Sequence, residues 1–162
     1  MPNFDLAPSA HPYKSLNEEC GVFGILDKDS ACLGRTLYFG LYALQHRGQE
    51  GAGMAVYDNH QMRSHKEMGL VNQVFNEPLL DRMHGQIGIG HTRYSTTGAS
   101  NLDNAQPVVA RTPFGALTLA HNGNLINTEA LREFLHGQDV YGYGSSDSHL
   151  MAMYVSYLLN QG

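Results

Sequence analysis

Cys20 and Cys32 are the only cysteines in the 162-residue sequence, and Cys20 stands where a thiol could do chemistry. It follows Glu18-Glu19 and opens a glycine-flanked apolar run, GVFGIL. Removal of the preceding residues would give Cys20 an α-amine, whose ordinary pKa of about 7.7–8.0 suits it to take the thiol proton near neutral pH. Nucleophile and base would then belong to one residue, as in N-terminal threonine enzymes. A lone cysteine at a strand start is more often a small buried hydrophobe, so the interpretation needs other residues.

Acyl transfer from a carboxamide also requires donors for the developing oxyanion, and the segment HNGN at 121–124 offers two. The side-chain NH2 of Asn122 and the backbone N–H of Gly123 are suitable donors, and glycine lets the backbone approach a substrate closely. The alternative is an ordinary Asn-Gly turn, which is commoner.

A free amino-acid substrate presents one carboxylate and one ammonium group. Arg93, in HTRYSTTG, could hold the carboxylate through its two-pronged guanidinium, and Asp147, in SSDS, could hold the ammonium. The alternatives are a surface arginine and a helix-capping aspartate.

Composition excludes several classes of protein. The net charge of −5, without any cluster of Lys or Arg, speaks against a nucleic-acid groove or an anionic membrane surface as a partner. No apolar stretch is long enough to span a bilayer, and residues 1–19 lack the apolar core of a secretory signal. Nine histidines occur without HxxxH or CxxC spacing, so no metal site is expected. Two cysteines exclude a disulfide framework and favour the cytoplasm.

Apolar periodicity predicts an α+β domain of short elements behind an irregular, proline-interrupted leader at 1–19. Strands are expected at 20–27, 52–58, 61–68, 86–95, 107–111 and 115–121, with turns at Asp58-Asn59 and at 113–115. Helices are expected from Leu33 to a stop at Gly48, at 78–83, from an Asn127 cap to Gly137, and from Ser146 or Asp147 onward, with Leu150, Tyr154, Tyr157 and Leu158 on one face. The last helix has no closing cap or strand, so the domain is expected to be incomplete at its C-terminus.

Six motifs occur in the order and spacing of class II glutamine amidotransferases, which this chain resembles from about residue 18 to 148: EECGVFGI, LQHRGQE, GHTRYSTTG, NAQP, LAHNGNL and SSDS. The resemblance implies the N-terminal-nucleophile hydrolase fold, an αββα sandwich of two antiparallel sheets between helix layers. It also implies that residues 1–19 are a removed propeptide and that residues 20–162 form part of a type 2 glutamine amidotransferase domain.

The resemblance assigns a role to each matching position. It makes Cys20 the nucleophile, with its α-amine as base, and places the oxyanion hole at Asn122 and Gly123. The substrate-binding residues implied are Arg93 for the glutamine carboxylate, Asp147 for its α-amine, and Thr96 and Gly48 as parts of the pocket wall.

The segments RGQE and RYST most resemble the branch of the class II glutamine amidotransferases that serves purine biosynthesis. There, ammonia from L-glutamine would react with phosphoribosyl pyrophosphate on a phosphoribosyltransferase domain, absent here, to form phosphoribosylamine. The resemblance implies Mg2+ and a 4Fe-4S cluster only for the full-length enzyme, with cluster ligands beyond residue 162 and no cofactor within this chain. It also implies a homo-oligomer for the full-length enzyme.

Two positions depart from the family pattern next to the expected site: His149 replaces an acidic residue after S-D-S, and Gly51 replaces a common serine. We expect these two differences to adjust the reactivity of the site rather than to change the reaction that it performs. Two alternatives stay open from sequence. One is a non-catalytic truncated fragment or split subunit, and the other is the glutaminase domain of a hexosamine-phosphate or asparagine synthetase.

Overall fold

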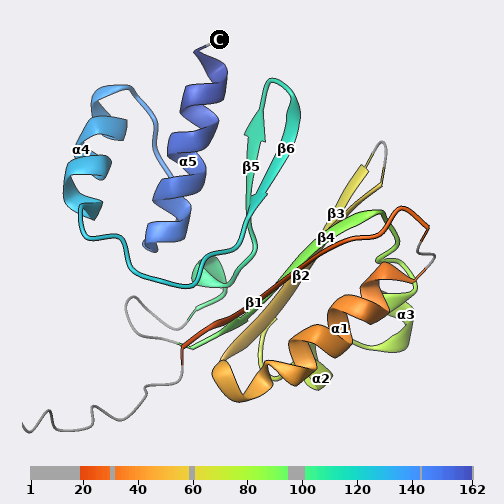
Figure 1. Cartoon of the computed structure of the whole chain (residues 1–162). Helices are drawn as coiled ribbons and strands as arrows, with labels where there is room; N and C mark the ends of the chain where they lie inside the picture. The colour runs from red at the N-terminus through yellow and green to blue at the C-terminus, as the bar shows by residue number, and fades with distance from the viewer. Residues whose placement is uncertain (1–18, 30–31, 59–60, 95–100, 143, 162) are drawn as a thin grey trace, which may run out of the picture.

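The structure is a computed structural model that describes residues 19–29, 32–58, 61–94, 101–142 and 144–161. Two antiparallel sheets form its centre (Figure 1). The first has four strands in the order β1-β4-β2-β3, and the second has two strands, β5 and β6. The strand bounds are Gly21–Leu26 (β1), Gly51–Asp58 (β2), Gln61–Met68 (β3), Ile87–Arg93 (β4), Val108–Thr112 (β5) and Gly115–Leu119 (β6).

Helix α1, Leu33–Ala43, lies along one face of the four-stranded sheet (Figure 1). Its leucines at 33, 37 and 41 recur at helical spacing and are fully buried against the sheet. The sheet admits them because β4 is glycine there: a Cβ on Gly88 would lie 2.7 Å from Leu37, and one on Gly90 would lie 2.7 Å from Leu41. The alternation in IGIG therefore sets how closely helix and sheet approach.

The core of this layer is completed by short elements that follow β3. Helix α2, Val71–Val74, and helix α3, Glu77–Leu80, contribute Val71, Val74 and Leu80 to one apolar cluster with α1 and β2. The side chain of Asn76 caps α3 by accepting a hydrogen bond from the Leu79 N–H. A 3-10 turn, η1 at Gln45–Arg47, continues α1 toward β2.

The second layer consists of the β5–β6 hairpin with two helices beside it, α4 at Thr128–Gly137 and α5 at Asp147–Asn160 (Figure 1). Ser146 caps α5, because its hydroxyl accepts from the backbone N–H of His149. Leu135 of α4 and Leu150 and Ala152 of α5 are buried. A second 3-10 turn, η2 at Leu102–Asn104, precedes β5.

One end of the four-stranded sheet is less covered on the face opposite α1. Leu26, Ile87 and Tyr57 are neighbours in the register of β1, β4 and β2. Their exposed fractions are 65%, 49% and 45%, respectively. The described second layer therefore covers the half of this face that bears His91 and Arg93, both buried, more fully than the half near Ile87.

The α+β class, the two antiparallel sheets and the flanking helices are as the sequence predicts. Four details differ. Helix α2 was not expected, the helix predicted at 78–83 is only Glu77–Leu80, and Asn127 stands before α4 without a side-chain capping bond. Leu158, expected on the packed face of α5, is 49% exposed. Asn59, predicted in the β2–β3 turn, and residues 1–18 of the expected leader lie outside the described residues.

Candidate active site

Cys20 directly precedes β1, and the register of β1 against β4 decides where its thiol lies. Because Gly21 pairs with Thr92, Cys20 comes to the end of β4. The backbone N–H of Tyr94 donates to Cys20 Sγ at 3.3 Å, and Sγ lies 3.4 Å from the Tyr94 carbonyl oxygen, to which it donates. The thiol is thus held at a strand end by main-chain groups of its neighbour.

The Cys20 side chain faces the loop that leaves β6. Glu19, Cys20, Asn122, Gly123 and Asn124 line one small hollow of about 20 Å³. The fold therefore brings together the expected nucleophile and both expected oxyanion donors, although about a hundred residues separate them in the sequence. The hollow has room for roughly one water molecule, which is less than a carboxamide side chain needs.

Gly123 adopts a backbone conformation that few other residues tolerate. Its φ is +155°, and a Cβ there would lie 2.8 Å from His121 Nε2. Any side chain at this position would therefore meet both backbone strain and the imidazole. The local geometry requires glycine beside the thiol.

Asp147 is the first residue of α5, and it contacts the loop that leaves β6 at Leu125. One carboxylate oxygen, Oδ2, accepts a hydrogen bond from the Leu125 N–H at 2.9 Å and is 3.8 Å from His121 Nδ1. The other, Oδ1, accepts from the Ser148 N–H at 2.7 Å. Its side chain is 16% exposed. Asp147 thus contacts the loop that carries Asn122 and Gly123 but does not line the hollow at Cys20.

Arg93 ends β4 and is 5% exposed. Its Nη1 donates to the Asn104 carbonyl oxygen at 2.8 Å, and the Asn104 amide donates in turn to the Ser145 hydroxyl at 3.0 Å. The guanidinium is therefore engaged with η2 and the approach to α5. Arg93 is one residue from Tyr94, which contacts the thiol, yet it does not line the Cys20 hollow.

The two remaining predicted pocket residues differ in what can be described. Gly48 follows η1, where a Cβ would stand 2.5 Å from the Thr92 carbonyl carbon and oxygen. The segment before β2 therefore lies directly on the end of β4, close to the strand end that holds the thiol. Thr96 lies outside the described residues.

A buried histidine, His91 of β4, lies near this site. It is 0% exposed, and neither ring nitrogen has a partner in good hydrogen-bond geometry. Burial lowers the pKa of His91 to about 4; a polar contact with the His121 backbone opposes this effect, and unfavourable electrostatic interactions with Arg93 and with His121 add to it. His91 is consequently neutral at physiological pH.

Sequence reasoning missed several residues that shape the site. Arg47 approaches the Cys20 carbonyl oxygen through Nε at 3.5 Å, and Asn124 lines the hollow. Gln106 makes two hydrogen bonds to the backbone of His121. Arg47 and Gln106 fall in the motifs LQHRGQE and NAQP, so the motifs themselves were the available signal.

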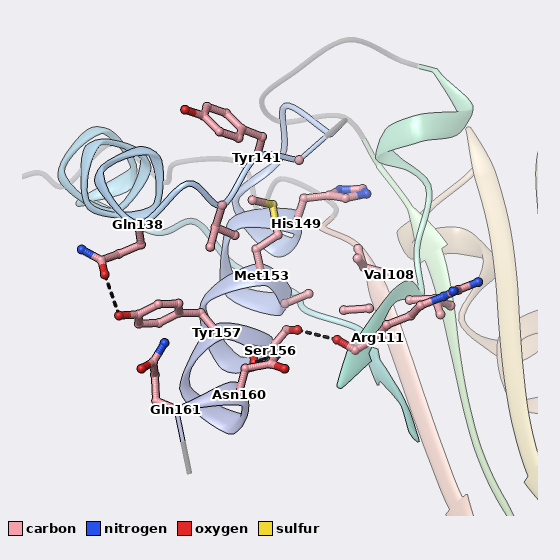
Figure 2. A pocket seen from close by; sticks show the side chains of 15 residues that line it. Val108, Arg111, Gln138, Tyr141, His149, Met153, Ser156, Tyr157, Asn160 and Gln161 are labelled. Atoms are coloured by element: carbon pink, nitrogen blue, oxygen red, sulfur yellow. Dashed lines mark hydrogen bonds between the residues drawn. The ribbon is translucent and has the colours of Figure 1, made fainter. Parts of the chain in front are cut away.

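A roomier hollow lies elsewhere. It has a volume of about 750 Å³ between β5 and α5, with Val108, Tyr141 and Met153 in its wall (Figure 2). Ser156 donates to the Arg111 carbonyl oxygen across it. None of the predicted site residues that the structure describes lines it.

Within the described residues, no three His, Cys, Asp or Glu side chains are grouped so as to hold a metal ion. None of the helices in the same part of the chain is long and apolar enough to cross a membrane.

No family model matches the chain. The two antiparallel sheets flanked by helices, with a thiol at the start of β1 facing an Asn-Gly loop, have the fold of the N-terminal-nucleophile class of glutamine amidotransferases. Among solved structures, the chain is similar to one titled as the allosteric regulatory enzyme of purine biosynthesis (TM-score 0.74, 41% identity, 81% of this chain and 28% of that chain). It is also similar to the glutamine phosphoribosylpyrophosphate amidotransferase of B. subtilis (TM-score 0.72, 40% identity, 82% of this chain and 28% of that chain).

The curated relatives described next are named amidophosphoribosyltransferase. The amidophosphoribosyltransferase of Synechocystis sp. is 48% identical over 155 residues, which are 95% of this chain and 31% of the relative. That of Bacillus subtilis is 44% identical over 140 residues, 86% of this chain and 29% of the relative. The chain matches amidophosphoribosyltransferases over most of its own length, and it spans about three tenths of the length of these relatives. The hexosamine and asparagine alternatives find no support in these comparisons.

Proposed function

We propose that this chain is the glutaminase part of an amidophosphoribosyltransferase, in which Cys20 hydrolyses L-glutamine through a thioester. The observation that carries the proposal is the single hollow shared by Cys20, Asn122 and Gly123. A nucleophile and two oxyanion donors in one place are the minimum for acyl transfer. Similarity to amidophosphoribosyltransferases suggests the class of substrate.

The proposed mechanism requires cleavage between Glu19 and Cys20. With Glu19 attached, the Cys20 nitrogen is a peptide amide, which has no basic lone pair to accept the thiol proton. Glu19 also lines the hollow, which is too small for a carboxamide side chain. Removal of residues 1–19 would therefore both create the base and clear space in front of the thiol.

In the processed chain, the α-amine of Cys20 takes the thiol proton, and the thiolate attacks the glutamine Cδ. The side-chain NH2 of Asn122 and the N–H of Gly123 donate to the resulting oxyanion. The carbon–nitrogen bond breaks as the α-ammonium gives its proton to the departing ammonia, leaving a γ-glutamyl thioester. Water, deprotonated by the same α-amine, attacks the thioester, and glutamate leaves as the thiolate is restored.

Substrate recognition is assigned to the residues around this hollow. We propose that Arg93 holds the glutamine carboxylate and Asp147 its α-ammonium, with Gly48 and Thr96 in the pocket wall. In the structure Arg93 contacts the Asn104 carbonyl and Asp147 contacts Leu125 and Ser148. Glutamine binding would therefore add to or replace these contacts.

For the whole protein we propose that the ammonia reacts with phosphoribosyl pyrophosphate on a phosphoribosyltransferase domain to give phosphoribosylamine. The names of the relatives support this, and one of them includes phosphoribosylpyrophosphate. Mg2+ would assist that second reaction on the phosphoribosyltransferase domain. A cytoplasmic location, a homo-oligomeric full-length protein and an iron–sulfur cluster outside this chain stay predictions.

Covalent labelling and intact-mass measurement test the proposal together. A glutamine analogue with an electrophile at the carboxamide position should add one label to processed protein, at Cys20. The matched variants are Cys20→Ala, which should take no label and hydrolyse no glutamine, and Cys32→Ala, which should behave as the native protein because Cys32 is exposed and lies before α1. Labelling at Cys32, or active protein that retains residues 1–19, would contradict the mechanism. Correctly processed protein without turnover would support the non-catalytic alternative.

A further inference from the structure

Gln106 connects the loop that bears Asn122 and Gly123 to the β5–β6 hairpin. It precedes β5 by two residues and is 5% exposed. Its Oε1 accepts a hydrogen bond from the His121 N–H at 2.7 Å, and its Nε2 donates to the His121 carbonyl oxygen at 3.2 Å. One side-chain amide thus satisfies both main-chain groups of the residue directly before Asn122.

The side chain of Gln106 acts in place of a main-chain peptide group. Val108 pairs with Leu119 in the hairpin, so the same register sets Gln106 opposite His121. Pro107 stands between Gln106 and β5 and has no N–H to donate. The hairpin ladder is therefore extended by one further pair through a side-chain amide, which carries both a donor and an acceptor.

The backbone of Gln106 is itself fixed on the other sheet. A Cβ on Gly53 of β2 would come within 2.1 Å of the Gln106 carbonyl oxygen, so no larger residue fits beneath it. Gly53 pairs with His91 of β4, in the sheet whose first strand follows Cys20. Gln106 therefore links the sheet that carries the thiol to the loop that carries the donors.

The other end of the loop has a separate anchor. Leu125 donates its N–H to Asp147 Oδ2, so the segment from His121 to Leu125 is held at its first residue and at its last. Asn122, Gly123 and Asn124 lie between these anchors and are exposed toward the hollow. Displacing either anchor would move the donors relative to Cys20.

We propose that Gln106 is a positioning residue for the oxyanion hole: its side-chain amide sets the His121 backbone and thereby places Asn122 and Gly123 over the thiol. This inference rests on the proposed glutaminase function. Gln106 touches no reacting atom, so its effect should appear in transition-state stabilisation rather than in glutamine binding. Donors displaced by a fraction of an ångström lose much of their value, because catalytic geometry must hold within about 0.5 Å.

The test uses Gln106→Leu, which removes both hydrogen bonds, and Gln106→Glu, which keeps the shape and the acceptor but loses the donor when ionised. In processed protein, kcat for glutamine hydrolysis should fall roughly 10- to 100-fold, with KM changed by less than about threefold. Alkylation of Cys20 by iodoacetamide, which needs no oxyanion donors, should keep the native rate. The Gln106→Glu variant should also regain activity relative to the native protein as the pH is lowered, because protonation restores a donor.

Gln138→Leu is the matched control. In the native chain, Gln138 Oε1 accepts a hydrogen bond from the Tyr157 hydroxyl at 2.9 Å. Gln138 lines the roomier hollow between β5 and α5 (Figure 2) and does not line the hollow at Cys20. It should leave kcat unchanged.

Native kcat in both Gln106 variants would overturn the inference. So would a parallel loss of kcat, alkylation rate and thermal stability in both, since that would mark Gln106 as a support of the fold alone. No turnover by the unsubstituted processed protein would instead refute the proposed function, and with it the basis of the inference.

Discussion

Asn122 and Asn127 are two asparagines of one exposed segment that differ in their surroundings. Asn122 lines the hollow at Cys20, whereas Asn127 precedes α4 and makes no side-chain capping bond. Asn122→Ala should lower kcat for glutamine hydrolysis by roughly 100-fold or more, as loss of one oxyanion donor does. Asn127→Ala should leave kcat and stability nearly unchanged. Steady-state kinetics of the two variants measures the difference, and equal effects would remove Asn122 from the oxyanion hole.

His91 makes stability depend on pH. Its pKa falls from 6.5 to about 4 in the folded chain because it is buried. Between these values the unfolded chain binds a proton that the folded chain does not, so the free energy of unfolding should decrease as the pH is lowered through this window. The decrease is at most about 1.4 kcal/mol per pH unit.

The variant His91→Leu should lose this dependence. Urea unfolding at pH 6.5 and pH 5 should show the native protein losing roughly 1–2 kcal/mol more than the variant over that interval. Equal slopes for native protein and His91→Leu would show that another group is responsible.

At the scale of elements, the join between η1 and β2 depends on close backbone contact. A Cβ on Gly48 would stand 2.5 Å from the carbonyl of Thr92. The clash is with main-chain atoms, so no flexible side chain can move to relieve it. Gly48→Ala should therefore lower the free energy of unfolding by roughly 1–3 kcal/mol. Turnover should fall as well, since the adjoining end of β4 holds Cys20.

Gly137→Ala is the matched control for that substitution. Gly137 ends α4, and nothing lies within 4 Å of an added Cβ. There alanine should raise the free energy of unfolding by about 0.4–1 kcal/mol, because it restricts the unfolded chain without cost to the folded one. Urea unfolding of the two variants should thus give changes of opposite sign.

Sequence alone predicts those elements whose signal is local. The alternation in IGIG, the leucine spacing of α1 and the proline in α3 each act within a few residues, and the corresponding elements are present. Helix α2 was missed because its four residues carry no periodicity. It is held instead by distant groups, such as the Gln45 side chain that accepts from the Val71 N–H at 2.6 Å.

The same distinction applies to the candidate site. The residue types at Cys20, Asn122 and Gly123 indicate chemistry from sequence, and motif order places them in one family. The contacts of Tyr94 with the thiol and of Gln106 with His121 join strand ends far apart in the chain. Such contacts follow from register and layer packing, which no single segment encodes.

At the scale of the molecule, the partly uncovered end of the four-stranded sheet has a measurable property. Leu26, Ile87 and Tyr57 form an adjacent exposed apolar row. The 162-residue polypeptide should therefore bind an apolar fluorescent dye. Leu26→Thr combined with Ile87→Thr should lower that fluorescence by roughly half, since two of three apolar side chains are removed.

Ile126 provides the control, because it is fully exposed but lies in a loop outside this row. Ile126→Thr should leave dye fluorescence nearly unchanged. Undiminished dye binding in the double variant would mean that the dye occupies another surface, such as the hollow between β5 and α5.

The hollow at Cys20 has one wall on each layer of the molecule: the thiol belongs to the four-stranded sheet, and Asn122 and Gly123 belong to the loop that leaves the hairpin. Reactivity is thus a property of how the two layers are aligned, not of either one. A small displacement of one sheet relative to the other would abolish glutamine hydrolysis while every strand and helix stayed intact. Hydrostatic pressure acts on such voids between layers, so turnover should fail at pressures well below those that unfold the protein.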